Sequence, residues 1–184
     1  MNLDQANKIL NKYITSDRLL NHCYIVSKVM KHFANKLNED EEKWEIVGLL
    51  HDIDYEKYPE EHCIKSVDIL KEEGLDDSTI YSIQSHGYGL TKTDAKPNHI
   101  MEKVLFTIDE LTGLIYSTAL MRPDKKINQV EVKSVMKKFK TPSFSAKVDR
   151  QVILKGCEML NMTIEEVVQE CLIAMKQISD EIGL

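Results

Sequence analysis

Glycine, proline and long apolar runs are scarce in this sequence, and each scarcity excludes a class of protein. Seven Gly and four Pro in 184 residues are too few for the many tight turns of a β-sandwich or β-barrel. No apolar run is long enough to cross a bilayer, so we expect no membrane association. The first ten residues lack the basic start and apolar stretch of a secretory signal, so we expect a cytoplasmic protein.

Basic side chains are fewer than acidic ones, and closely spaced pairs of cysteines are absent. The 24 Lys and Arg against 30 Asp and Glu give a net charge of −6, which makes the chain a poor general binder of nucleic acid. No Cys-x-x-Cys pair occurs, and each of the four cysteines lies among apolar residues: Cys23, Cys63, Cys157 and Cys171. We expect four reduced thiols in the core of a cytosolic protein.

Apolar residues recur at helical spacing along almost the whole chain, and strict alternation is absent. This pattern predicts an all-α fold, a helical bundle of about eight or nine helices. Ser16, Asp40 and Asn98 are suited to cap helices, Pro59 to a first turn, and Thr163 to a capping box with its third successor, a Glu. The expected helices cover residues 3–13, 16–37, 40–51, 59–74, 78–87, 98–120, 127–139, 143–160 or 145–160, and 163–182.

The sharpest local feature is the run from Gly48 to Asp54, with His51 and Asp52 adjacent at the end of an apolar helix. An ionisable pair in such a place needs partners, because burying polar groups without them is costly. Imidazole and carboxylate together suit a divalent transition metal. A buried, hydrogen-bonded structural pair is the alternative.

Further candidate ligands follow on separate predicted helices. His22 lies on the apolar helix upstream, His86 closes the short helix before Gly87, and His62 lies in the helix that starts at Pro59. His62 has the alternative of a solvated first turn. Asp109 lies in an apolar run, where a carboxylate needs a cation or donors to stay ionised. The other two histidines fit surface or structural positions: His32 and His99.

This series resembles the HD superfamily of metal-dependent phosphohydrolases, in particular its uncharacterised bacterial members. The family pattern is a His, a His-Asp pair and a late Asp, on separate helices of an all-α domain; here it is His22, His51-Asp52 and Asp109. The tail, with Phe144-Ser145-Ala146 and Arg150, also looks like that type. The resemblance implies a single HD-type domain over residues 1–184, with a metal-binding core at about 16–120 and residues 121–184 completing the fold.

Two-metal members of the family carry further histidines, which His62 and His86 resemble, but Gly87 stands where many of them have a second His. The resemblance therefore implies one metal site and leaves a second open, for Mn, Fe, Co, Ni or Zn. Asp52 would bridge the two sites. Asp54 would orient a ligand His or act as a base, and Lys57 would touch a phosphate.

The charge is unevenly distributed. Residues 122–155 contain ten basic and three acidic side chains, a net of +7. From this segment we expect long side chains to hold a substrate phosphate: Arg122, Lys140, Lys147 and Arg150. A solvated basic helix face is the alternative.

Together these features predict a metal-dependent phosphohydrolase, a phosphomonoesterase or phosphodiesterase, that uses a metal-activated water on a small phosphorylated substrate. The resemblance favours a nucleotide. One alternative is a non-catalytic, metal-containing module that binds a nucleotide and regulates. Another is an RNA-associated protein that uses residues 122–155, although we expect no nucleic-acid partner.

Overall fold

The computed structural model describes residues 1–184 and contains nine α-helices, three short 3-10 helices and no strand, which confirms the all-α prediction. None of the helices has both the length and the apolarity needed to cross a membrane. The elements are α1 (Leu3–Tyr13), α2 (Asp17–Leu37), α3 (Glu41–Leu50), η1 (Pro59–Glu61), α4 (Lys65–Glu72), α5 (Asp77–Gln84), η2 (Ser85–Gly87), α6 (Ile100–Leu120), η3 (Ile127–Gln129), α7 (Val132–Phe139), α8 (Arg150–Leu160) and α9 (Ile164–Gln177).

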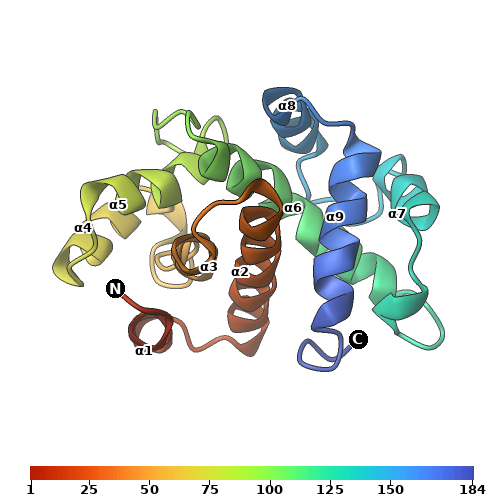
Figure 1. Cartoon of the computed structure of the whole chain (residues 1–184), viewed down its shortest axis with the longest axis horizontal. Helices are drawn as coiled ribbons and strands as arrows, with labels where there is room; N and C mark the ends of the chain where they lie inside the picture. The colour runs from red at the N-terminus through yellow and green to blue at the C-terminus, as the bar shows by residue number, and fades with distance from the viewer. The chain divides into compact units, whose positions relative to one another are not determined.

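The chain divides into two compact units, Met1–Phe106 and Thr107–Leu184. The α6 helix begins in the first unit and continues into the second, as the green ribbon of Figure 1 shows. The expectation of a single domain over residues 1–184 stays a prediction, because the boundary falls inside one continuous helix.

The α3 helix is the buried element of the first unit. After a polar first turn, every residue from Trp44 to Leu50 is buried, and α3 contacts α1, α2 and α5 (Figure 1). Gly48 allows the close approach of α2, because a Cβ on it would lie 2.8 Å from the Cα of Ser27. A helix that is apolar on nearly every side is buried on nearly every side, and the one charged residue of this buried stretch, Glu45, is paired with Lys28 and Lys31. The C-terminal end of α3 therefore carries His51 and Asp52 into the interior of the unit.

Three predicted helix starts are confirmed at the level of single hydrogen bonds. The side chains of Ser16, Asp40 and Thr163 accept from backbone N–H groups in the first turns of α2, α3 and α9. Thr163 forms the complete capping box with Glu166. These bonds satisfy donors that a helix cannot pair internally.

The helix predicted from Pro59 to Gly74 is broken into two elements. Pro59 starts only a 3-10 turn, and α4 begins six residues later. Between them Cys63 adopts a left-handed φ of 64°, which a helix cannot contain. The break is held by Asp54, whose carboxylate accepts from the Ser66 N–H at 2.7 Å. The next helix also begins earlier than predicted, with Asp76 rather than Ser78 as its N-cap.

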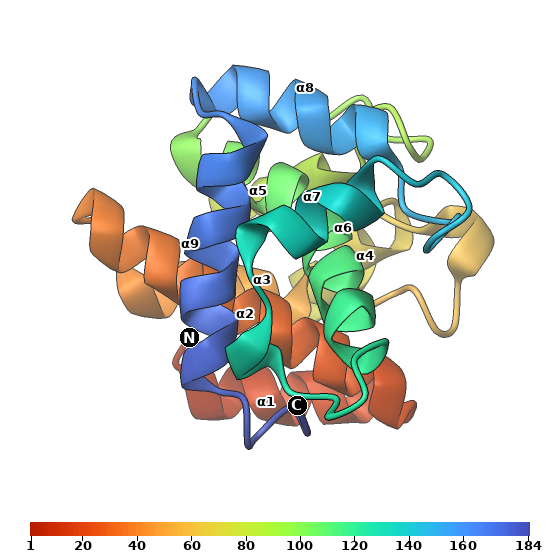
Figure 2. The ribbon, with the colours of Figure 1, turned by 90° about the vertical axis from the view of Figure 1, so that its right-hand side faces the viewer.

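In the second unit, α9 contacts α7, α8 and η3, and Figure 2 shows α7 beside α9. Three predicted helices are shorter than expected, and one of them is α9, which ends at Gln177 instead of residue 182. The segment 127–139 starts as a 3-10 turn before α7, and α8 begins only at Arg150, capped by Asp149. Gly156 lets α8 lie against α6, because a Cβ there would come within 2.1 Å of Thr107 Oγ1.

Arg150 explains why the segment before α8 is ordered without being helical. Its guanidinium donates to five backbone carbonyls, those of Phe139, Thr141, Phe144, Ser145 and Val148. Because a guanidinium has five N–H groups, this set uses all of them. The structure therefore assigns Arg150 to holding residues 139–148 in place, which corrects the phosphate-binding role predicted for it.

We expect Arg150→Met to lower the free energy of unfolding by about 2 kcal/mol or more. The hydrogen bonds from the charged guanidinium would be lost, and the five backbone carbonyls would be left without this donor. Urea denaturation of the full chain measures this. The matched control is Lys147→Met, an exposed cation of the same segment, with an expected change within about 0.5 kcal/mol. Equal stability of the two variants would contradict the role given to Arg150.

Candidate metal centre

Asp52 lies at the centre of a histidine cluster in the first unit. It follows the residue that caps α3, and its side chain is 10% exposed, whereas that of His51 is fully buried. Four imidazoles from separate elements turn their Nε2 atoms toward the Asp52 carboxylate: His22 of α2, His51 at the end of α3, His62 just after η1, and His86 of η2. The first unit thus brings together every histidine that the sequence marked as a ligand.

The carboxylate divides these imidazoles into two pairs. The Nε2 atoms of His22 and His51 lie 3.7 and 3.5 Å from Oδ2 of Asp52, and 3.2 Å from each other. On the other side, the Nε2 atoms of His62 and His86 lie 3.4 and 3.7 Å from Oδ1, and again 3.2 Å from each other. Each oxygen therefore completes its own set of three ligand atoms.

Backbone carbonyls hold two of these rings in the form that binds a metal. His51 Nδ1 lies 2.8 Å from the Gly48 carbonyl oxygen, and His86 Nδ1 lies 2.5 Å from that of Ile83. A carbonyl can only accept, so Nδ1 is the donor in each bond. In a neutral ring Nε2 then carries a lone pair and no proton, and this lone pair faces Asp52.

This donor set fits a cation. The Nε2 lone pairs of His51 and His86 face a carboxylate at 3.5 and 3.7 Å, and two acceptors face each other favourably only when something positive lies between them. Ligands about 2.1 Å from a transition metal lie about 3.0–3.4 Å apart at octahedral to tetrahedral angles. The separations around Asp52, 3.2–3.7 Å, are only slightly wider. The cluster is therefore compatible with a divalent metal on either side of Asp52.

Asp54 orients the third imidazole. It is fully buried, with Oδ1 2.7 Å from His62 Nδ1 and Oδ2 accepting from the Ser66 N–H. Because both oxygens are engaged, the geometry favours the orienting role over that of a base. Burial opposes protonation of His62, but the hydrogen bonds with Asp54 and Cys63 and the charge of Asp52 together outweigh it and raise the pKa of His62 to about 10. A metal on this side must therefore displace a proton from His62.

Two other predicted site residues lie outside this cluster. The Lys57 ammonium lies 3.3 Å from the Lys12 carbonyl oxygen and 5.0 Å from the centroid of the Tyr13 ring. It is thus directed at α1, and the phosphate contact expected of it stays a prediction. Asp109 lies half-buried on α6, in the second unit, and stays a candidate ligand.

The remaining candidates for phosphate binding belong to the second unit. Arg122 forms a two-fold hydrogen bond with Asp124, at 2.9 and 3.0 Å, so its guanidinium already has a carboxylate partner. Lys140 and Lys147 are exposed. These two lysines stay candidates for contact with a phosphate.

Sequence reasoning missed two neighbours of the cluster. Cys63, expected only as a core thiol, places its Sγ 3.5 Å from His86 Nε2. Tyr55, whose ring is 49% exposed, lies edge-on to the His62 imidazole with centroids 5.0 Å apart. The sequence feature that could have identified Cys63 as a neighbour of the cluster is its position directly after His62. Tyr55 gave no signal beyond its closeness to Asp52 in the chain.

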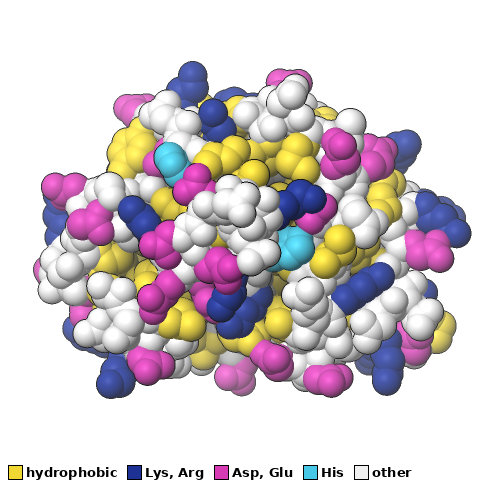
Figure 3. All heavy atoms as spheres, viewed as in Figure 1, with side chains coloured by type: hydrophobic (Ala, Val, Ile, Leu, Met, Phe, Trp, Pro, Cys, Tyr) yellow, Lys and Arg dark blue, Asp and Glu magenta, His cyan; other side chains and the backbone are white.

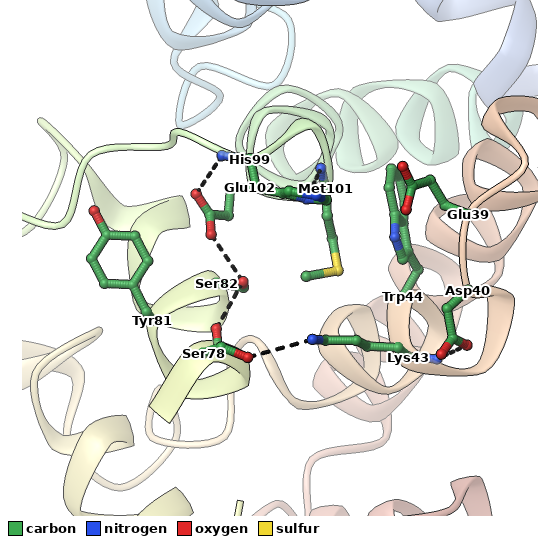
Figure 4. Close-up of a pocket in the computed structure, with 10 residues that line it drawn as sticks. All are labelled: Glu39, Asp40, Lys43, Trp44, Ser78, Tyr81, Ser82, His99, Met101 and Glu102. Carbon is green, nitrogen blue, oxygen red and sulfur yellow. Dashed lines mark hydrogen bonds between the residues drawn. The ribbon is translucent and has the colours of Figure 1, made fainter. Parts of the chain in front are cut away.

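A separate cavity of about 470 Å³ lies in the first unit and contains no predicted ligand (Figure 4). Trp44 and Met101 line it, and Glu102 borders it with a carboxylate that is already engaged. That carboxylate accepts from the Asn98 and His99 N–H groups and from the Ser82 hydroxyl. The Glu102 carboxylate therefore holds the start of α6 and is not available to a ligand in the cavity.

The fold and the cluster define a helical protein with a histidine–aspartate cluster that is compatible with a divalent metal. The HD domain family model matches residues 19–114, and the chain belongs to this family. The matched span contains all the histidines of the cluster, together with Asp52 and Asp109.

A curated relative covers part of the chain. Over 132 residues the chain is 30% identical to the tRNA (cytidine(56)-2'-O)-methyltransferase of Thermoplasma volcanium. The match covers 67% of this chain and 38% of that protein, so the chain corresponds to well under half of the relative. No solved structure matches the chain.

We expect Asp54→Asn to weaken metal binding on the Oδ1 side by about 10–100-fold, because a neutral amide orients His62 less strongly and leaves a poor partner for the Ser66 N–H. Isothermal titration of metal-stripped protein with Zn²⁺ or Mn²⁺ measures each binding step. The step assigned to His22 and His51 should be unchanged. The control is Asp68→Asn, an exposed carboxylate on α4, and a loss of both steps or of neither in Asp54→Asn would contradict the assignment.

Proposed function

We propose that this chain is a metal-dependent phosphohydrolase that acts on a small phosphorylated substrate. The observation that carries the proposal is the convergence of four imidazole Nε2 atoms on the two oxygens of one buried carboxylate. Membership of the HD domain family supports the reaction class. We propose Asp109 as the fourth ligand on the His22 side, from its place in the family pattern.

The residues of the chain have separable roles in this proposal. Asp52 would bridge two ions, and the imidazoles would hold one ion on each of its sides. Such ions, when bound, lower the pKa of water enough to provide hydroxide near neutral pH. Asp54 acts as a positioning residue through His62, because both of its oxygens are already engaged.

The substrate class is the least constrained part of the proposal. A nucleotide is favoured by resemblance to the family, and Lys140 and Lys147 are the cations proposed to contact its phosphate. Mixed imidazole and carboxylate ligands suit Mn, Fe, Co, Ni or Zn. Four free, buried cysteines support a cytoplasmic location as part of the same proposal.

We expect His51→Ala and Asp52→Ala to lose bound metal and to lose hydrolysis of generic phosphomonoesters and phosphodiesters, by at least about 10³-fold, because water is no longer activated. Metal analysis of the purified variants and a phosphatase and nucleotide screen measure the two effects. The matched control is His32→Ala, on α2 but outside the cluster. Full activity in both cluster variants would overturn the proposal.

The alternative is a regulatory module that binds a nucleotide without turnover. It is kept open by Gly87, which stands where many two-metal members have the second histidine of a His-His pair, so the Oδ1 side has His62 and His86 but no third imidazole. A thermal-shift screen of metal-replete protein with nucleotides, run beside the activity screen, separates the two functions. Stabilisation by a nucleotide that is not hydrolysed would favour the module.

Binding of an RNA partner is a third candidate function, because the similar Thermoplasma protein is named for its action on tRNA. The chain itself gives little support. Arg122 and Arg150 are engaged by protein groups, and on the face in Figure 3 basic side chains are scattered among acidic ones.

We therefore expect no salt-dependent binding of tRNA to the full chain at physiological ionic strength, because a net charge of −6 opposes approach to a polyanion. Fluorescence anisotropy of a labelled tRNA transcript over a range of salt concentrations measures this. Tight binding that falls steeply with salt, and that weakens in the Lys140→Gln, Lys147→Gln double variant, would establish RNA as a partner.

A further inference from the structure

We propose that the Cys63 thiolate is a fourth side-chain ligand on the Oδ1 side of Asp52, together with His62, His86 and Oδ1 itself, and that it makes this side selective for a soft metal such as Zn²⁺. The inference rests on the proposed function, since it concerns the second metal of the same centre. Cys63 would thus supply a ligand on the side where Gly87, which has no side chain, cannot supply one.

The first observation is position. Cys63 is fully buried, and its Sγ, with a ligand nitrogen of His62 and one of His86, forms a group whose atoms all lie within 4.8 Å of one another. Sγ lies 3.5 Å from His86 Nε2, and a sulfur and a nitrogen ligand of tetrahedral Zn²⁺ lie about 3.6 Å apart. Sγ is also 3.9 Å from His86 Nδ1, so the sulfur lies beside the ring. The proposal requires the thiol to turn about its Cα–Cβ bond toward the two Nε2 atoms.

The second observation is that the sulfur occupies the space a side chain at position 87 would need. A Cβ built on Gly87 would lie 2.4 Å from Cys63 Sγ and 2.9 Å from Cys63 Cβ. No real contact is that short, so a side chain at 87 and the thiol of Cys63 in its present position exclude each other, and Thr91 Oγ1, at 2.6 Å, obstructs the same space. Where many two-metal members place an imidazole, this chain therefore places a sulfur.

The third observation is the backbone of Cys63. Its φ of 64° is in the left-handed region, which is unfavourable for a residue other than glycine and persists where the surroundings fix it. Glycine would adopt this conformation without that cost. The left-handed turn directs the Cys63 side chain inward, next to His86, instead of outward like its neighbour Ile64, which is 36% exposed.

Ligand chemistry then sets the metal preference. On binding, a bond forms between sulfur and the metal, the S–H bond breaks, and the proton goes to solvent. Thiolate and imidazole favour Zn²⁺, whereas carboxylate and imidazole alone discriminate little. The candidate ligand groups that contain His22 or His51 include no cysteine, so the two sides should differ in metal preference.

The test uses Co²⁺ as a spectroscopic probe of the full, metal-stripped chain. A thiolate ligand gives Co²⁺ an intense charge-transfer absorption in the near ultraviolet, which nitrogen and oxygen ligands do not. We expect this band in the wild-type chain and its loss in Cys63→Ser. Cys171→Ser, which removes another buried free thiol, should keep the band. The affinity for the second Zn²⁺ should fall in Cys63→Ser by more than the about 10–100-fold typical of losing an outer partner.

A measurement without a variant guards against misfolding of Cys63→Ser. X-ray absorption of the Zn²⁺-loaded wild-type chain should show a sulfur neighbour at about 2.3 Å. Two bound ions with no sulfur neighbour and no charge-transfer band would overturn the role of Cys63 and leave the proposed function intact. Failure of the wild-type chain to bind any divalent metal would overturn both.

Discussion

The two oxygens of Asp52 are the constraint on which the rest of the first unit depends. Four imidazoles reach this carboxylate from α2, α3 and the two 3-10 turns. A buried carboxylate facing nitrogen lone pairs is unfavourable unless cations or protons separate them. The packing of α3 inside the unit creates this situation, and a divalent metal on each side would resolve it. The packing that buries the apolar side chains of α3 therefore also brings the candidate ligands together.

The ends of helices orient the ligands. His51 and His86 each follow a helix, and each bonds the carbonyl three residues before it, that of Gly48 or Ile83. Carbonyls in the last turn of a helix have no partner within the helix, so an imidazole at this position satisfies one and fixes its own tautomer at the same time. His62 lacks such a helix end, and Asp54 replaces the carbonyl as the partner of its Nδ1.

The sequence predicted the helices and the ligands better than their surroundings. Helical periodicity and capping residues located α2, α3 and α9, and the order of His22, His51, His62 and His86 located the cluster. It did not predict the roles of long cations, because the partner of a flexible side chain is set by tertiary contacts. Arg150 was expected on a phosphate and holds five carbonyls, and Lys57 lies against α1. The left-handed turn at Cys63 was missed because nothing in a Glu-Glu-His-Cys run signals it.

Cys63 and Gly87 are best understood as one feature of the structure. Taken alone, Gly87 is an absent ligand and Cys63 a core thiol in a strained conformation. Taken together, the missing side chain of one leaves the space that the side chain of the other fills, next to His86. A histidine introduced at 87 would meet this sulfur and the Thr91 hydroxyl, because a Cβ there would lie 2.4 Å from Cys63 Sγ and 2.6 Å from Thr91 Oγ1. It would therefore not restore the two-histidine arrangement, even beside a smaller side chain at 63. The departure from the family pattern at 87 thus depends on positions 63 and 91 together.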